Sequence, residues 1–347
     1  MVDVTIRGAG IFGLSIAWAC TERGARVQLV DPAGPGAGAS GGLVGALAPH
    51  VPENWNDKKA FQFDSLLAAR RFWPEVEAAG GVSAGFRATG RVQPIADAGA
   101  LALARARCDS AATLWQGKAE WRVIEASSMA PWAPPSPTGL VIHDTLSAHL
   151  HPRRACAALV VALRARAVEV VPDAPARGAV IWATGVAGLI ALGADAGRDV
   201  GGAVKGQAAL LVPRRPPPPD APQIFADALH IIPHADGTVA VGSTSERDHE
   251  GPTTTDASLD RLIDRARAQV PWLREARVVE RWAGLRPRAK SRAPMLGAWP
   301  GKGGHFIANG GFKIGFGMAP EVARVIADLV LEGADAIPDG FRVAASL

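Results

Sequence analysis

A single lysine, Lys313, stands in a loop that otherwise has few large side chains. The stretch HFIANGGFKIGFGMAPEVARVIADLV, residues 305–330, joins a short apolar strand to a helix through a glycine-rich segment. Glycines before a helix let a flat or anionic group approach the backbone, and a lysine among them adds positive charge. The stretch therefore predicts a site for a negatively charged ligand.

The N-terminus carries a second set of residues with a defined chemistry. Gly8, Gly10 and Gly13 form the pattern GxGxxG directly after an apolar strand. In such a pattern the first glycine permits a tight turn, the second lets backbone approach a pyrophosphate, and the third lets helix pack on strand. The start of the following helix adds positive dipole. These residues predict that the chain binds a dinucleotide.

The elements around this pattern have the order that the prediction requires. Residues 4–31 indicate a strand, a turn, a helix and a second strand that ends at Asp31. The Asp31 carboxylate can accept hydrogen bonds from an adenosine ribose, and its charge would repel a 2′-phosphate. A glycine set that only packs a helix on a strand is the alternative, but it does not explain the acid at the required spacing.

Two later segments extend the predicted site. Residues 34–49, GPGAGASGGLVGALAP, are too rich in glycine and alanine for an ordinary crossover, and they suggest a ligand longer than one pyrophosphate unit. Residues 178–189 indicate a buried strand that ends in Ala183, Thr184 and Gly185. We expect this strand to be parallel and to reach the dinucleotide site. A simple nicotinamide dehydrogenase would be expected to continue promptly into another helix and strand.

Composition sets limits on the other classes of function. The chain has 347 residues, enough for two domains or one domain with a large insertion, and its net charge is +4. The predicted pI is near 9.2, yet no run of basic residues forms a nucleic-acid footprint. The three cysteines, Cys20, Cys108 and Cys156, are scattered, which argues against a disulfide framework or a zinc site and suits the cytoplasm. We expect no metal and no membrane span.

The ordered series of motifs resembles the D-amino-acid-oxidase-like flavoenzymes, in particular the glycine oxidase and sarcosine oxidase branch. The series runs over nearly the whole chain, from GAGIFG and Asp31 through GASGG, LHP, ATG and KGQ. It continues with HIIPHADGTVAVGSTSE, WAGLRPR and APMLG, and the glycine-rich loop before the last helix closes it. Single pieces are unspecific, but their common order is a strong signal.

The resemblance implies an α/β fold: a Rossmann-like FAD-binding domain of the D-amino-acid-oxidase type with an inserted antiparallel-sheet substrate domain. The FAD-binding domain would be discontinuous and comprise residues 1–80, 141–205 and 281–347. The substrate-binding domain would comprise residues 81–140 and 206–280. The stretch HIIPHADGTVAVGST agrees, because two short strands around Ala-Asp-Gly predict a hairpin. Residues 319–332 predict an amphipathic helix with Val322 and Ile326 on one face.

The cofactor that the resemblance implies is FAD rather than NAD. The three cysteines all precede residue 157, so the C-terminal cysteinyl linkage of some relatives is excluded and the FAD is expected to be non-covalent. The residues expected to bind it are Gly8, Gly10, Ile11, Phe12, Gly13, Asp31, Ala39, Ser40, Gly41, Gly45, Ala46, Val170, Ala183, Thr184, Gly185, Arg286, Gly311, Phe312, Lys313, Ile314 and Gly315.

The resemblance also implies an anchor for a substrate carboxylate. Arg286, in GLRP, matches the arginine that holds the carboxylate in glycine oxidase-like members, and guanidinium binds carboxylate well through two parallel hydrogen bonds. Lys313, in GGFK, resembles a sarcosine-oxidase lysine that assists binding of the carboxylate. The alternatives are a structural Arg286 paired with an acid such as Glu280, and a Lys313 that faces solvent.

Several positions depart from the family. The chain contains no tyrosine, and His230 occupies a place where relatives often have one, so it is a third candidate for substrate contact or else an ordinary core or surface histidine. The chain has no lysine between Lys205 and Lys290, so a lysine linked to oxygen activation in sarcosine oxidases is missing there. A dehydrogenase that uses an acceptor other than oxygen is therefore an alternative.

The resulting expectation is an FAD-dependent amine or amino-acid oxidase or dehydrogenase. It would oxidise the C–N bond of a small carboxylate-bearing amine, such as glycine, sarcosine or a D-amino acid, by hydride transfer to flavin. One alternative is a tRNA-modifying oxidase that removes a carboxymethyl arm from a modified uridine. Another is a non-catalytic FAD-binding or redox-sensing protein. The sequence does not specify the oligomeric state.

Overall fold

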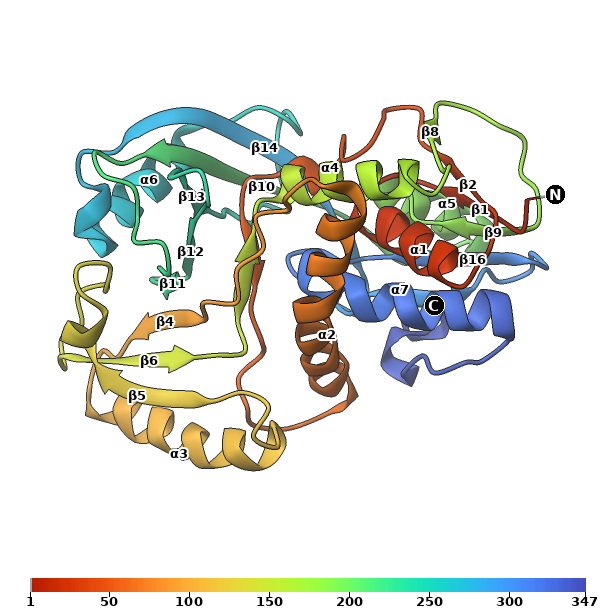
Figure 1. Cartoon of the computed structure of the whole chain (residues 1–347). Coiled ribbons are helices and arrows are strands. Elements are labelled where there is room, and N and C mark those ends of the chain that lie inside the picture. Colours follow the sequence, from red (N-terminus) through yellow and green to blue (C-terminus); the bar gives the residue numbers. More distant parts are fainter. Residues whose placement is uncertain (1) are drawn as a thin grey trace.

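The computed structural model describes residues 2–347, and two large sheets organise the chain (Figure 1). Six strands form the first sheet in the order β15-β16-β9-β1-β2-β8. Their bounds are β1 Val4–Arg7, β2 Val27–Val30, β8 Val170–Val171, β9 Ala179–Trp182, β15 Met295–Ala298 and β16 His305–Asn309. All neighbouring pairs are parallel except β15 and β16. This sheet confirms the α/β, Rossmann-like prediction.

Helices pack on the first sheet and on one another and bury its apolar strands. Those that contact the sheet are α1 Ile11–Glu22, α5 Gly185–Ala196 and α7 Gly315–Glu332, while α2 Asp57–Gly80 packs on α7 and α4 Pro152–Arg164 packs on α1 and α2. Side chains of α1, α2, α4 and α7 share one core with β1 and β2. Leu189 and Leu192 of α5 belong to another cluster with Ile307 of β16. Because burial of these apolar faces drives the packing, the two clusters fix the sheet between its helices.

The turn from β1 into α1 depends on two glycines. Gly8 has a φ of +102°, and a Cβ there would lie 2.4 Å from the carbonyl oxygen of Ala183. A Cβ on Gly13 would lie 1.8 Å from the carbonyl oxygen of Gly8. No side chain fits at either distance, so the strand, the helix and the end of β9 approach one another only because these positions are glycine.

Eight strands form the second sheet, in the order β14-β10-β13-β12-β11-β4-β6-β5. Their bounds are β4 Arg91–Pro94, β5 Trp121–Glu125, β6 Leu140–Asp144, β10 Gly201–Val212, β11 Gln223–Ala226, β12 Leu229–Pro233, β13 Val239–Gly242 and β14 Arg277–Ala289. Neighbours are antiparallel except β4 and β11. The β12–β13 hairpin confirms the hairpin prediction.

Shorter elements complete the second half of the molecule. Helix α3, Ala98–Leu114, packs on β5, and α6, Ala257–Gln269, packs on β10, β12 and β13. A two-stranded sheet joins β3, Gly45–Leu47, to β7, Ala148–Leu150. In Figure 1 the second sheet with α3 and α6 lies on one side, the first sheet with α1 and α7 on the other, and α2 between them.

The last helix begins earlier than the sequence predicted. Helix α7 starts at Gly315 rather than near residue 319, so Gly315 and Gly317 both lie in its first turn. Glycine has a low intrinsic helix propensity, which hides this turn from a sequence pattern. Packing of α7 against α1 and α2 supplies the stabilisation that propensity lacks.

The predicted division into two domains remains a prediction. Strands of the second sheet come from residues 91–144, 201–242 and 277–289. β6 therefore begins at the edge of the range 141–205 that was expected for the FAD-binding domain, and β10 begins inside that range. Within residues 2–347, none of the helices combines the length and apolar character needed to cross a membrane.

Candidate functional site

A cavity of about 1360 Å³ connects residues of both large sheets. Its wall includes the β1–α1 turn, the end of β2, the start of α5, part of β14 and the loop before α7. Typical small-molecule sites have volumes of roughly 300–1000 Å³, so this one has room for a ligand of dinucleotide size and a small substrate. The chain therefore brings its N-terminal motif and its C-terminal loop to one cavity.

The dinucleotide motif is held open by hydrogen bonds around the start of α1. Oδ2 of Asp31 accepts from the backbone N–H of Ala9 at 2.7 Å, and Oδ1 accepts from the N–H of Ala33 at 2.9 Å. The Oγ of Ser40 accepts from the N–H of Ile11 at 2.9 Å. These contacts place the first turn of α1, with its positive dipole, at the cavity wall.

The residues present fit an extended anionic cofactor such as FAD. Gly8, Gly10, Gly311 and Gly315 line the cavity, where larger side chains would fill it. A Cβ on Gly311 would lie 2.9 Å from Cζ of Phe12, so the loop before α7 can lie on that ring only as glycine. Helix starts supply backbone N–H donors for a diphosphate, and Asp31 supplies acceptors for a ribose.

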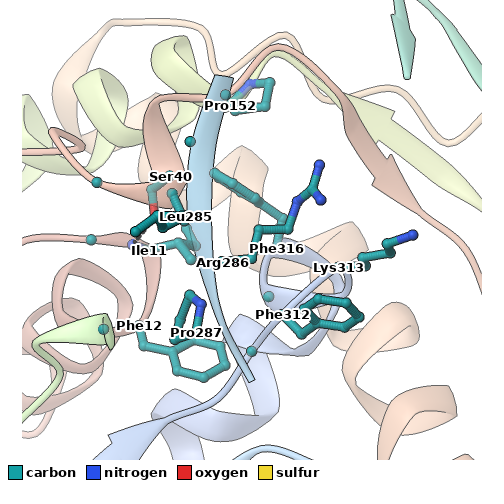
Figure 2. A pocket seen from close by; sticks show the side chains of 18 of the residues that line it. Ile11, Phe12, Ser40, Pro152, Leu285, Arg286, Pro287, Phe312, Lys313 and Phe316 are labelled. Atoms are coloured by element: carbon teal, nitrogen blue, oxygen red, sulfur yellow. Dashed lines mark hydrogen bonds between the residues drawn. The ribbon is translucent and has the colours of Figure 1, made fainter. Parts of the chain in front are cut away.

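Arg286 lies on β14 at the cavity wall, and its guanidinium is projected from that strand (Figure 2). The residue is 8% exposed, and its Nη1 donates to the backbone oxygen of Thr244 at 3.2 Å. Within residues 2–347 no carboxylate lies within 4.0 Å of it. Burial lowers the pKa of Arg286 to about 10, and the more distant Glu246 opposes that shift.

The alternative partner for Arg286 is engaged elsewhere. Glu280 forms an ion pair with Arg153, with Oε1 2.6 Å from Nη2. Glu280 is therefore not the partner of Arg286. A buried guanidinium without a carboxylate partner has lost hydration that no protein anion replaces, so it favours an anionic ligand.

Lys313 borders the same cavity from the loop before α7, with its Nζ 5.7 Å from the centre of the Phe312 ring. Its side chain is exposed, and in Figure 2 it extends on the same side of β14 as Arg286. Partial burial and the positive charges of Arg286 and Arg288 lower the pKa of Lys313. Lys313 and Arg286 thus act on each other electrostatically, which is the arrangement expected of two cations near one anion.

His230 also lines the cavity, on β12, with its ring centre 4.8 Å from that of Phe225. Burial, Arg91 and Lys313 together lower its pKa to about 3, so the imidazole is neutral at pH 7. Its Nδ1 has no hydrogen-bond partner among the described residues. A neutral ring beside two cations is a suitable neighbour for a bound substrate, although the ring itself carries no charge.

Most residues expected at the cofactor site line the cavity. Those at its wall are Gly8, Gly10, Ile11, Phe12, Asp31, Ala39, Ser40, Ala46, Ala183, Thr184, Gly185, Arg286, Gly311, Phe312, Lys313, Ile314 and Gly315. Gly13, Gly41, Gly45 and Val170 are not at the wall. Gly13 and Gly45 lie against backbone, since a Cβ on Gly45 would meet the oxygen of Leu150 at 2.0 Å.

Several other residues at the wall were not predicted. Arg91 of β4, Phe225 of β11, and His50 and Gln62 on either side of the start of α2 all line the cavity. His50 follows directly on the second glycine-rich segment, so its position was a usable hint. Arg91 begins β4 and Phe225 lies inside β11, and neither position offered a hint.

Other kinds of site are not supported in the described chain. Residues 2–347 contain no group of three His, Cys, Asp or Glu side chains placed to hold a metal ion. All three cysteines are free, and burial raises the pKa of Cys20 and Cys156 to about 12. These thiols are therefore poor nucleophiles at neutral pH.

Comparisons with known proteins agree with this geometry. The family described as FAD dependent oxidoreductase matches residues 3–329. Glycine oxidase of Geobacillus kaustophilus is 26% identical over 94% of this chain and 92% of its own length. Glycine oxidase of Pseudomonas aeruginosa is 34% identical over 31% of this chain, and the match spans only 29% of that protein.

Solved structures share the fold over almost the whole chain. Glycine oxidase from Geobacillus kaustophilus superimposes with a TM-score of 0.83 at 22% identity and covers 98% of both chains. Iminodiacetate oxidase from Chelativorans sp. BNC1 gives a TM-score of 0.83 at 21% identity, again over 98% of both chains. At these identities the likeness concerns the fold.

Proposed function

Because the chain belongs to the FAD dependent oxidoreductase family, we propose that it oxidises the C–N bond of a small amino acid or N-substituted glycine. The observation that carries this proposal is the buried guanidinium of Arg286, which stands at the cavity wall without a carboxylate partner in residues 2–347. A substrate carboxylate would supply the missing anion and orient the carbon that bears the amine.

The cofactor is FAD, which supplies the acceptor for a hydride taken from the carbon that bears the amine. The chain's own residues hold the cofactor and orient the substrate. The first turn of α1 and Asp31 bind the diphosphate and ribose. Arg286 binds the substrate carboxylate, Lys313 adds a second positive charge, and neutral His230 borders the substrate. The product imine is then hydrolysed to an oxo acid and ammonia or an amine.

Removal of the Arg286 side chain should lower kcat/KM. A hydrogen bond to a charged group contributes about 1.5–3 kcal/mol, so loss of Arg286 should reduce kcat/KM by roughly ten- to a hundredfold. A neutral replacement also removes the desolvation cost of the buried charge, so the Arg286→Ala protein should remain folded. The loss should appear mainly as a higher KM, because the anchor binds substrate before the reaction as well as during it.

The test is an anaerobic screen of flavin bleaching with glycine, sarcosine, proline and D-amino acids. Arg286→Ala should bleach at least tenfold more slowly at low substrate. The matched control is Arg281→Ala on the same strand, where the arginine pairs with exposed Asp260. Equal rates for wild type and Arg286→Ala would refute the anchor. Reoxidation by air would then distinguish an oxidase from a dehydrogenase.

The same protein should be tested against tRNA, since the chemistry of removing a carboxymethyl arm is closely related. The small-substrate proposal expects no salt-dependent binding of tRNA. Binding that weakens steeply as salt rises would instead favour the tRNA-modifying function.

A further inference from the structure

The cavity wall carries another arginine, Arg91, on a different strand of the second sheet from Arg286. Arg91 lies on β4 and is 6% exposed. Its Nε donates to Oδ2 of Asp144 at 2.9 Å, and its guanidinium carbon lies 6.0 Å from the centre of the Phe225 ring. The pair with Asp144 joins β4 to β6, since the two residues are opposite each other in that ladder.

This ion pair uses only one edge of the guanidinium. Asp144 is fully buried, and its other oxygen, Oδ1, accepts from the N–H of Ser147 at 2.8 Å. Neither terminal nitrogen of Arg91 has a hydrogen bond within residues 2–347. Because a guanidinium has five N–H donors, four remain for a ligand at the cavity wall. A purely structural arginine would not need to present them there.

Apart from Asp144, which does not line the cavity, the groups around Arg91 are neutral or positive. His50 has a pKa lowered by burial, and His230 has a pKa of about 3, with the charge of Arg91 contributing to both shifts. Lys313 also acts on His230, so the imidazole lies within the fields of both cations. The carboxylates at the wall, Asp31 and Asp173, lie beyond the ends of β2 and β8, next to the dinucleotide motif.

We propose that Arg91 binds a second carboxylate of the substrate, so that the preferred substrate is a dicarboxylic amino acid or a doubly carboxymethylated amine rather than glycine. This inference rests on the proposed function, because it takes Arg286 and Lys313 as the site of the first carboxylate. A substrate with one carboxylate leaves the free donors of Arg91 facing a cavity from which the ligand has displaced water. A second carboxylate supplies charge-assisted hydrogen bonds at that point.

The experiment measures binding of acids to the FAD-loaded protein by flavin absorbance and by calorimetry. The acids are paired by length, butyrate with succinate and valerate with glutarate, so that each pair differs in one carboxylate. In wild type the diacid of at least one pair should bind roughly ten- to a hundredfold more tightly than its monoacid. Aspartate, glutamate and iminodiacetate should likewise bleach the flavin at lower concentrations than glycine or sarcosine.

The variants separate recognition from folding. Arg91→Met leaves Asp144 buried and unpaired, so the decisive variant is Arg91→Met with Asp144→Asn, which removes both charges and keeps an acceptor for the Ser147 N–H. This protein should lose the preference for diacids and keep the wild-type affinity for butyrate. The matched control is Arg107→Met with Glu53→Gln, which removes an ion pair of 2.7 Å that does not line the cavity.

The outcomes distinguish this inference from the function on which it rests. Equal affinities for mono- and diacids in wild type, or a preference that survives in the Arg91 and Asp144 double variant, overturn the role of Arg91 while the proposed function stands. If no acid perturbs the flavin and no amine bleaches it, the proposed function itself fails, and the role of Arg91 falls with it.

Discussion

Arg286 and Lys313 differ in how the fold treats their charge. Arg286 is buried against β10, where a Cβ on Gly206 would lie within 2.0 Å of three guanidinium atoms, whereas Lys313 is exposed on a loop. Burial of an unpaired cation is costly, so the fold retains Arg286 at a cost in stability that an anionic ligand offsets. Lys313 can adjust to the ligand at little cost because its side chain is long and mobile.

These two cations predict a pH dependence of anion binding. The pKa of Arg286 is lowered to about 10 and that of Lys313 is lowered from 10.5, so both are charged at neutral pH and lose their protons earlier than free side chains on alkaline titration. The Ki of butyrate, whose own charge is constant above pH 6, should therefore rise as pH approaches and passes about 10. Butyrate keeps both groups protonated, so its binding should take up protons in that range.

Lys313→Arg identifies the contribution of the lysine. Arginine retains its proton to higher pH, so the rise in Ki should move upward in pH while Ki at neutral pH changes little. Exposed Lys118→Arg, which lies just after the end of α3 and does not line the cavity, is the control and should leave the profile unchanged. A butyrate Ki that stays constant to pH 11 in wild type would show that neither cation contacts the carboxylate.

Strands β10 and β14 together set the position of the arginine. In their ladder Gly206 is opposite Gly284 and Val204 is opposite Arg286, so the guanidinium turns back over the empty position of Gly206. A Cβ at that position would lie 1.8 Å from Nη1 of Arg286. The glycine of the KGQ motif is thus explained by the space that the arginine occupies.

Gly206→Ala should consequently displace the anchor without unfolding the protein, because the obstructed atoms belong to a flexible side chain. We expect butyrate to bind at least tenfold more weakly, with FAD still bound. Gly202→Ala on the same strand is the control, since no heavy atom lies within 4 Å of a Cβ there. Calorimetry with butyrate and thermal unfolding would measure both effects; unchanged affinity in Gly206→Ala would mean that Arg286 is not the anchor in its observed position.

This pair of strands also shows what the sequence could not reveal. The motif around Gly8 and Asp31 is local, so its spacing predicted the dinucleotide site, whereas Arg286 was expected only from the family resemblance. The contact between Gly206 and Arg286 depends on the register of two strands that are distant in the sequence, which no local pattern encodes. Arg91 was missed as well, because nothing local marks an arginine at the start of an ordinary strand as one that faces a cavity.

In the molecule as a whole, the cavity is enclosed by segments from both ends of the chain. The β1–α1 turn supplies one part of its wall, and β14 with the loop before α7 supplies another. Helices α1 and α7 pack on each other, so the first and last parts of the chain are joined through one core as well as through the cavity. A ligand that contacts all of these segments stabilises the folded state as a unit.

FAD should therefore stabilise the apoprotein far more than riboflavin, which lacks the diphosphate and adenosine that fit the start of α1 and Asp31. At a concentration a thousand times its Kd, FAD contributes about 4 kcal/mol, enough to raise Tm by several degrees. Asp31→Asn keeps an oxygen that can accept from the N–H of Ala9 or Ala33 but removes the charge, so it should weaken FAD binding and leave any effect of riboflavin unchanged. Thermal unfolding of the apoprotein with FAD and with riboflavin measures the rise in Tm that each ligand produces. Equal shifts with FAD and riboflavin would show that the N-terminal motif contributes nothing to cofactor binding, and that only the flavin-facing part of the cavity holds it.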